Sequence, residues 1–169
     1  MDIKRAIELL RTHADAIRGL VAGTPGEQAR WKPDAGSWSI LEVINHLYDE
    51  EREDFRLRLD TCLNRPGDAW PPIDPQGWVV QRQYNSRDLE HSLRNFLEER
   101  QRSLAWLAGL GSPDLEAEQT APFGQIRTGD LLAAWTAHDL LHLRQLVELH
   151  WAWMQKEVAP FDVRYAGEW

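Results

Sequence analysis

The sequence has one cysteine, fewer positively than negatively charged residues, and no long apolar run. A single cysteine, Cys62, cannot form an internal disulfide, so nothing indicates a secreted scaffold held together by disulfides. The net charge of −8 argues against nucleic acid or an anionic membrane as the main partner. The first residues show no signal peptide, and no segment has the length and hydrophobicity of a membrane span. We therefore expect a cytoplasmic protein that binds neither nucleic acid nor membrane.

The rest of the composition is that of an ordinary globular domain. Hydrophobic residues make up 43% and charged residues 27% of the 169 positions, and a chain of this length can bury a core without disulfides. We find no internal repeat, no low-complexity segment and no convincing domain boundary. The sequence therefore predicts a single domain spanning residues 1–169.

Hydrophobic residues recur at helical spacing in four segments, and no segment has a good strand pattern. Ser39 and Glu42 form a capping-box pattern that predicts the start of the second helix. The third helix is predicted to start at Asn85 or Ser86. Long connections are expected at residues 64–84 and 111–127. These features predict an all-α four-helix bundle. The long connections permit an up-down-down-up order, which the periodicity alone leaves open.

Two histidines lie four residues apart on the predicted fourth helix. Four residues advance a helix by about 400°, so His138 and His142 lie one turn apart on nearly the same face. Their neighbours on that face are apolar, and two buried polar rings need partners, which a shared metal ion would supply. His46 lies on the second helix and is the candidate third ligand. Three imidazoles with an open position are typical of a catalytic metal site, although a His-x-x-x-His pair also arises by chance.

The other histidines are interpreted as structural or surface residues. His150 is eight residues beyond His142, which rotates it by about 80° from that side chain. His13 lies at the edge of the apolar face of the first helix, and His91 lies in a polar stretch. The spacing therefore leaves three candidate ligands.

The segments around these three histidines resemble the DinB/YfiT-like superfamily. The resemblance rests on WSILEVINHL at residues 38–47 and AHDLLHLRQL at residues 137–146, together with the lengths between them. The ending VRYAGEW at residues 163–169 is similar to the tail of one subgroup. The resemblance spans nearly the whole chain, and it joins His46 to the pair on the last helix.

This resemblance implies more than the composition does. It implies an up-down-down-up four-helix bundle and one divalent metal ion held by His46, His138 and His142. Zinc or nickel is expected first, with iron or manganese as further candidates. Many members of the superfamily form homodimers. Some relatives are thiol-dependent isomerases or S-transferases that use mycothiol, bacillithiol or glutathione, and many others have no known activity.

Three kinds of function remain open on this basis. A divalent ion lowers the pKa of a bound thiol or water, so the first hypothesis is a metal-dependent, thiol-dependent transferase acting on a small electrophilic substrate. A low-molecular-weight thiol would then be a second partner. The alternatives are a non-enzymatic metal-binding stress protein and a metal-dependent hydrolase. An open coordination position favours an enzyme, and a closed or apolar-plugged position favours the stress protein.

Metal-bound histidines usually donate their second N–H to a neighbouring polar group. Asp49 and Glu50 lie close to the face of His46, and Gln145 shares the face of His138 and His142. These three residues are the candidates for that supporting role. A charge run such as the acidic stretch after His46 is more often a solvated helix face.

Overall fold

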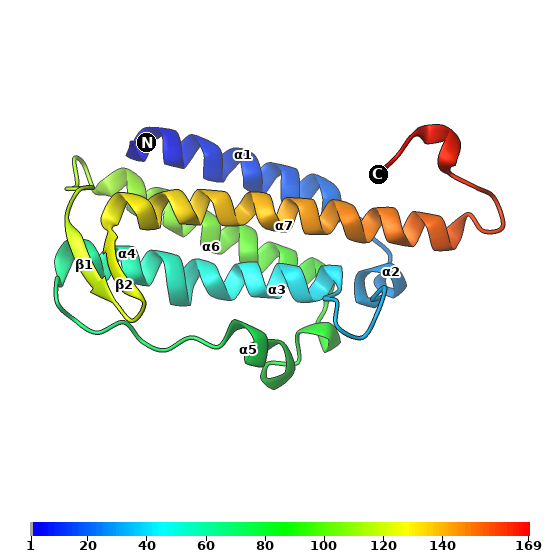
Figure 1. The fold of residues 1–169 in the computed structure, drawn as a ribbon, viewed down its shortest axis with the longest axis horizontal. Helices are drawn as coiled ribbons and strands as arrows, with labels where there is room; N and C mark the ends of the chain where they lie inside the picture. Colours follow the sequence, from blue (N-terminus) through cyan, green and yellow to red (C-terminus); the bar gives the residue numbers. More distant parts are fainter. Residues whose placement is uncertain (1) are drawn as a thin grey trace.

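A computed structural model of the chain describes residues 2–169. Four long helical segments form the bundle: α1 (Ile3–Val21), α3 (Ile40–Glu50) continued by η1 (Glu51–Phe55) and α4 (Arg56–Asn64), α6 (Leu89–Gly109), and α7 (Thr128–Glu157). Figure 1 shows α1 and α7 running in one direction, while α3–α4 and α6 run in the other. The predicted four-helix bundle with up-down-down-up order is therefore confirmed.

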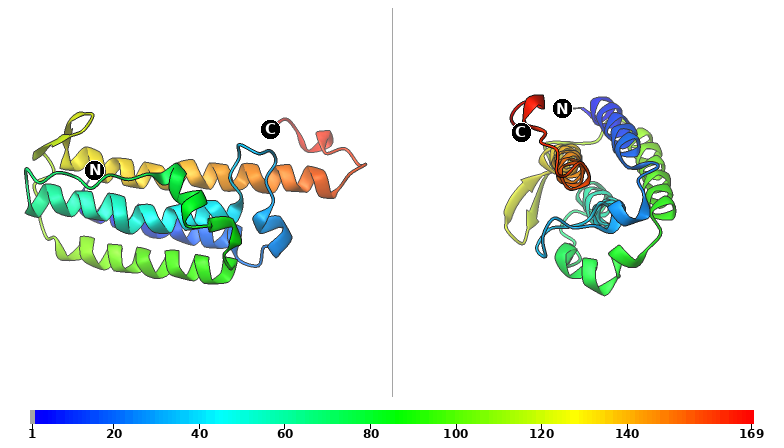
Figure 2. Two further views of the ribbon diagram at one scale, coloured as in Figure 1. Left: turned by 90° about the horizontal axis from the view of Figure 1, so that it is seen from below. Right: turned by 90° about the vertical axis from the view of Figure 1, so that its right-hand side faces the viewer.

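Shorter elements fill the connections. They are α2 (Gly26–Arg30), α5 (Pro75–Gln81), η2 (Tyr84–Ser86), β1 (Glu118–Ala121), β2 (Gly124–Arg127) and η3 (Arg164–Ala166). The connection that carries α5 runs along the outside of the bundle (Figure 2). It returns the chain to the end from which α3 started, and so lets α6 run in the same direction as α3–α4.

Apolar faces at helical spacing form the core. α1 packs on both α6 and α7, and α3 packs on α6. One buried cluster includes Leu10, Leu59 and Trp135, and a second includes Ile17, Ile44 and Leu146. In the described part of the chain, no helix combines the length and hydrophobicity needed to cross a membrane.

The helix starts follow local capping chemistry. The Ser39 hydroxyl accepts from the Glu42 amide at 3.2 Å, and the Glu42 carboxylate accepts from the Ser39 amide at 2.9 Å. This confirms the predicted capping box. The predicted start of the third long helix at Asn85 or Ser86 is wrong. Asp88 caps α6 by accepting from the backbone N–H of the third helical residue at 2.8 Å, while residues 84–86 form a separate 3₁₀ turn.

A short hairpin was not expected from the sequence. β1 pairs with β2 in antiparallel register, from Glu118 opposite Arg127 to Ala121 opposite Gly124. Each strand has four residues and is mostly polar, so it carries too little alternation for a strand prediction. The hairpin lies at one end of the bundle and leaves the helical class unchanged (Figure 1).

A buried network around Arg100 joins all four helical segments. All five guanidinium N–H groups of Arg100 are used: two on Glu51, two on Asp139 and one on the Leu10 carbonyl, at 2.7–2.9 Å. The Trp135 indole N–H donates to Glu51 at 3.0 Å. Glu51 opens the π-helical turn η1, a type of irregularity that often lies near functional sites.

Candidate metal centre

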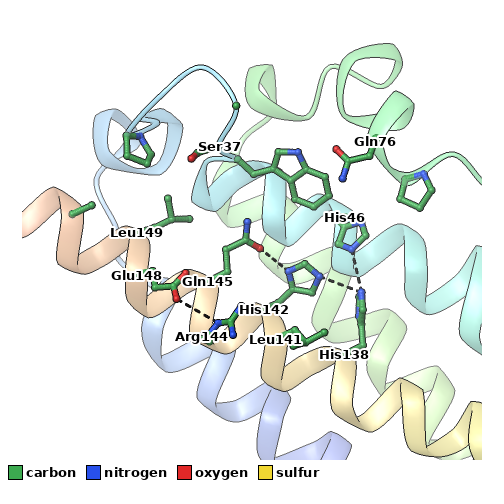
Figure 3. A pocket seen from close by; sticks show the side chains of 15 residues that line it. Ser37, His46, Gln76, His138, Leu141, His142, Arg144, Gln145, Glu148 and Leu149 are labelled. Atoms are coloured by element: carbon green, nitrogen blue, oxygen red, sulfur yellow. Dashed lines mark hydrogen bonds and ion pairs between the residues drawn. The ribbon is translucent and has the colours of Figure 1, made fainter. Parts of the chain in front are cut away.

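Three histidines from two helices meet on one side of the bundle. His46 comes from α3, and His138 and His142 come from successive turns of α7 (Figure 3). The Nε2 atom of His138 lies 3.3 Å from His46 Nε2 and 3.1 Å from His142 Nε2. The fold therefore brings together the three side chains that the sequence singled out.

These nitrogen positions fit a metal ion. Imidazole nitrogens bind zinc at about 2.0–2.1 Å, which places two nitrogens of a tetrahedral site about 3.3 Å apart. The two spacings centred on His138 agree with that value. All three donor atoms lie within 4.8 Å of one another. The residues present are therefore compatible with a shared divalent ion.

Gln145 holds the ring of His142 in the form that a metal ligand needs. Its side-chain oxygen lies 2.8 Å from Nδ1 of His142. An amide oxygen can only accept, so Nδ1 carries the proton and Nε2 presents its lone pair to the other histidines. Figure 3 shows Gln145 on the side of His142 away from His138.

Glu50 lies behind His46. Its Oε1 atom is 3.9 Å from His46 Nδ1, about 1 Å longer than a hydrogen bond. Both atoms are buried and have no hydrogen-bond partner within residues 2–169. A small shift of either side chain would join them. Glu50 thus lies beside His46, as the sequence suggested, but the two side chains are too far apart for a hydrogen bond.

Asp49 does not support the histidines. Its carboxylate accepts from the Tyr84 hydroxyl, from Arg82 at 2.6 Å and from Arg52 at 3.1 Å. Residue 49 is three positions after His46, which turns its side chain toward η2 and the end of α5 rather than toward α7. The structure therefore places Asp49 in a contact that fastens the outer connection to α3.

Burial keeps the three imidazoles neutral. Desolvation, followed by the neighbouring imidazoles, lowers the pKa of His46 to about 2. Desolvation, followed by the charge of His142, lowers the pKa of His138 to about 3. Desolvation also lowers the pKa of His142, against an opposing effect of Gln145. Neutral imidazole is the form that binds metal ions.

Burial has the opposite effect on the neighbouring acids. Desolvation, and then the charge of Asp54, raises the pKa of Glu50 to about 8. Desolvation likewise raises the pKa of Asp54, although its ion pair with Arg58 opposes the shift. The Glu50–Asp54 pair, which lies close to His46, thus keeps a proton more readily than exposed carboxylates do.

A cleft of about 780 Å³ opens onto the histidines. It lies between α7, the middle of α3, the loop before α3 and the start of α5. Besides the three histidines, its polar lining comprises Ser37, Gln76, Arg144, Gln145 and Glu148. Trp38 also lines it, whereas Trp70, Trp78 and Trp135 do not.

Trp38 and Gln76 are among the cleft residues that the sequence did not single out. Trp38 lies one residue before the cap of α3 and eight residues before His46. A tryptophan about two helical turns before a candidate ligand was the sequence feature that could have indicated its place in the cleft. Gln76 comes from the outer connection, which has no periodic pattern to place it. Tertiary structure alone assigns Gln76 to the cleft.

The remaining histidines have other partners. His13 Nδ1 lies 3.5 Å from Asp139, and His150 Nδ1 lies 3.0 Å from the amide nitrogen of Gln28. His91 is exposed beside Arg94. His13 is buried rather than at the edge of its helix face. None of the three belongs to the triad that the described residues form.

Comparison with known proteins places the chain in a family. The model of the DinB superfamily matches residues 9–146, and the chain belongs to this superfamily. Among solved structures, the fold is similar to that of YfiT from Bacillus subtilis, with a TM-score of 0.77 and 21% identity over 87% of this chain and 85% of that chain. YfiT is described as a probable metal-dependent hydrolase with an unusual four-helix bundle topology.

Two curated relatives carry a similar description. A protein of Geobacillus thermodenitrificans named "Putative metal-dependent hydrolase" is 32% identical over 92 residues, which is 54% of this chain and 51% of that protein. The match thus spans about half the length of that relative. A protein of Oceanobacillus iheyensis named "Putative metal-dependent hydrolase OB0782" is 26% identical over 135 residues, covering 79% of this chain and 77% of that protein.

Proposed function

We propose that this protein is a metal-dependent hydrolase that binds one divalent ion through His46, His138 and His142. The observation that carries the proposal is the convergence of three Nε2 atoms, at 3.1 and 3.3 Å around His138, on the wall of an open cleft. A metal ion that only stapled α3 to α7 would need no such cleft. The names of the two curated relatives support hydrolysis.

The residues around the site have distinct tasks in this proposal. When bound, a divalent ion lowers the pKa of water and polarises a substrate oxygen. Gln145 keeps the lone pair of His142 Nε2 directed at the ion, and Glu50 is positioned to orient His46. Arg144 and Glu148 form an exposed ion pair at 3.3 Å on the cleft wall, where they can bind polar substrate groups. Neutral imidazole donors suit zinc and nickel, as well as iron and copper.

Metal content tests the site. Protein purified without a histidine tag should contain close to one divalent ion per chain by elemental analysis. His142→Ala should lose most of it, whereas His150→Ala, two turns further along α7 and bound to Gln28, should retain it. Full retention of metal by His142→Ala would refute the ligand assignment.

Hydrolysis is tested separately from binding. Small activated esters and amides, offered to the metal-loaded protein in thiol-free buffer, should be cleaved at a rate that falls at least tenfold in His138→Ala and after chelation. Equal cleavage rates in the metal-loaded and the metal-free protein would refute the proposed metal-dependent hydrolase activity.

A thiol-dependent transferase is the second candidate, and the size of the cleft favours it. A cleft of about 780 Å³ can hold a small thiol beside a substrate. Cys62 is buried and does not line this cleft, so the thiol would have to be a separate small molecule. In this case, a low-molecular-weight thiol should change the visible spectrum of the cobalt-substituted protein. An unchanged spectrum with every cellular thiol tested would eliminate this candidate.

We also propose that the protein forms a homodimer. Leu140, Val147 and Met154 are exposed apolar side chains spaced seven residues apart on one face of α7, and an apolar helix face of this kind suits a second copy. Light scattering coupled to size exclusion should give twice the chain mass. A monomer at micromolar concentration would contradict the proposal.

A further inference from the structure

Trp38 covers the histidines from the side of the loop that precedes α3. Its ring centroid lies 4.8 Å from that of His46 and 6.3 Å from that of His142. The rings of Trp38 and His142 are parallel to within 3°. The capping box of Ser39 and Glu42 fixes the backbone immediately after Trp38. The indole therefore has a defined position against two of the three proposed ligands.

The spacing leaves no room for another ring on this side of the histidines. A planar group inserted between two parallel rings would need about 7 Å between them, twice the usual carbon–carbon contact distance. The Trp38–His142 centroid distance is shorter than this, and the Trp38–His46 distance is shorter still. A ligand at the histidines must therefore extend away from the indole or be compact.

A second pocket lies on the other side of Trp38. It measures about 550 Å³, and Trp38, Gly36, Ser37 and Gln76 line both this pocket and the histidine cleft. Its remaining lining includes Lys32, which pairs with Glu42 at 2.7 Å, and Gln83. The indole thus lies at the boundary between two adjoining spaces, of which only one is lined by the histidines.

We propose that Trp38 is a specificity-determining residue of the histidine site. It closes the site toward the second pocket, so the protein accepts substrates whose group at the reacting atom is compact or extends away from the indole, and rejects those that place a ring on the indole side. This proposal rests on the proposed function, because it requires a ligand bound at the three histidines. It adds the class of substrate, which the three ligands alone do not define.

Hydroxamates of different size test the proposal, since they bind metal ions without requiring turnover. The dissociation constants of acetohydroxamate and naphthohydroxamate are measured by visible absorption on cobalt-loaded protein. Naphthohydroxamate should bind the wild type much more weakly. In Trp38→Ala, the ratio of the two constants should fall at least tenfold, because the fused rings occupy the space that the indole leaves. Trp38→Phe, which keeps an aromatic ring against the core, should give an intermediate ratio.

Trp31→Ala is the matched control. Trp31 packs on Trp153 with ring centroids 5.5 Å apart and lines neither pocket, so its removal should leave the ratio unchanged. An unchanged ratio in both Trp38 variants, with cobalt bound in the wild type and lost in His142→Ala, would overturn the role of Trp38 and leave the proposed function intact. Failure of the wild type to bind cobalt would overturn both.

Discussion

Replacing Arg100 with methionine should destabilise the protein more than any other single arginine substitution on α6. Arg100 is 1% exposed and lies between two carboxylates, Glu51 and Asp139, which are equally buried. Methionine fills much of the same volume but supplies no charge and no donor. The variant therefore leaves two buried carboxylates without their cation. Removing one partner from a buried ion pair costs about 3–5 kcal/mol.

Chemical and thermal unfolding measure this cost. For a chain of this size, about 3–5 kcal/mol corresponds to a decrease of roughly 6–20 °C in the melting temperature. Arg94→Met is the control, because Arg94 lies on the same helix but is exposed and bonds only to His91 among the described residues. It should change stability by less than about 0.5 kcal/mol. A loss below about 1 kcal/mol in Arg100→Met would refute the view that this network stabilises the fold.

The pH dependence gives an independent check on the same variant. Burial raises the pKa of Asp139, but the Arg100 charge more than offsets this, and the net shift is downward. In the wild type, Asp139 therefore contributes stability above its unfolded pKa, and this is lost as the pH falls through the lower folded value. Without Arg100, only the contact with His13 opposes the effect of burial on the pKa of Asp139, so the folded carboxyl is protonated more easily. The gap in stability between the two proteins should narrow from pH 7 to pH 4, and a constant gap would contradict the assignment.

Three further results are expected. Gln145→Leu should weaken metal binding about 10–100-fold by releasing the His142 ring, and an unchanged affinity in competition with a chelator would exclude this role. Metal binding at pH 6 should release few protons, because the pKa values of His46 and His138 are about 2 and about 3. Calorimetry in two buffers of different ionisation enthalpy measures this number. Three ordinary imidazoles would release about two protons, and that result would show that the rings are solvated. Ser39→Ala should cost about 1–2 kcal/mol in urea unfolding by removing the cap of α3. Alanine at the half-buried turn residue Ser37, whose hydroxyl bonds only to Asp34 among the described residues, should cost less; equal losses would argue against the cap.

Features that depend on nearby residues could be predicted from the sequence. The capping box joins residues three apart, and the His138–His142 pair needs only the pitch of one helix. The apolar stripes likewise follow from helical periodicity, so the bundle class was predictable. The resemblance to the superfamily then supplied the helix order, which periodicity could not.

Features that join distant segments were decided by the tertiary structure. His46 reaches His138 across 92 positions, and Arg100 reaches Glu51 and Asp139 across 49 and 39. No local pattern encodes such pairs, because each depends on how two helices pack. The placement of Asp49 shows the same limit: its closeness to His46 along α3 suggested a shared task, but the outer connection supplies Tyr84 and Arg82 as its partners.

By itself, then, the sequence determined the four long helices, the cap of α3 and the pair of histidines one turn apart, because hydrogen bonds and side-chain spacing within a helix depend on a few neighbouring residues. Only the tertiary structure decided that His46 meets that pair, that Gln76 reaches the cleft and that Trp38 stands between two pockets. These relations arise where separate segments bury their apolar faces together, and the polar groups carried with those faces meet as a consequence.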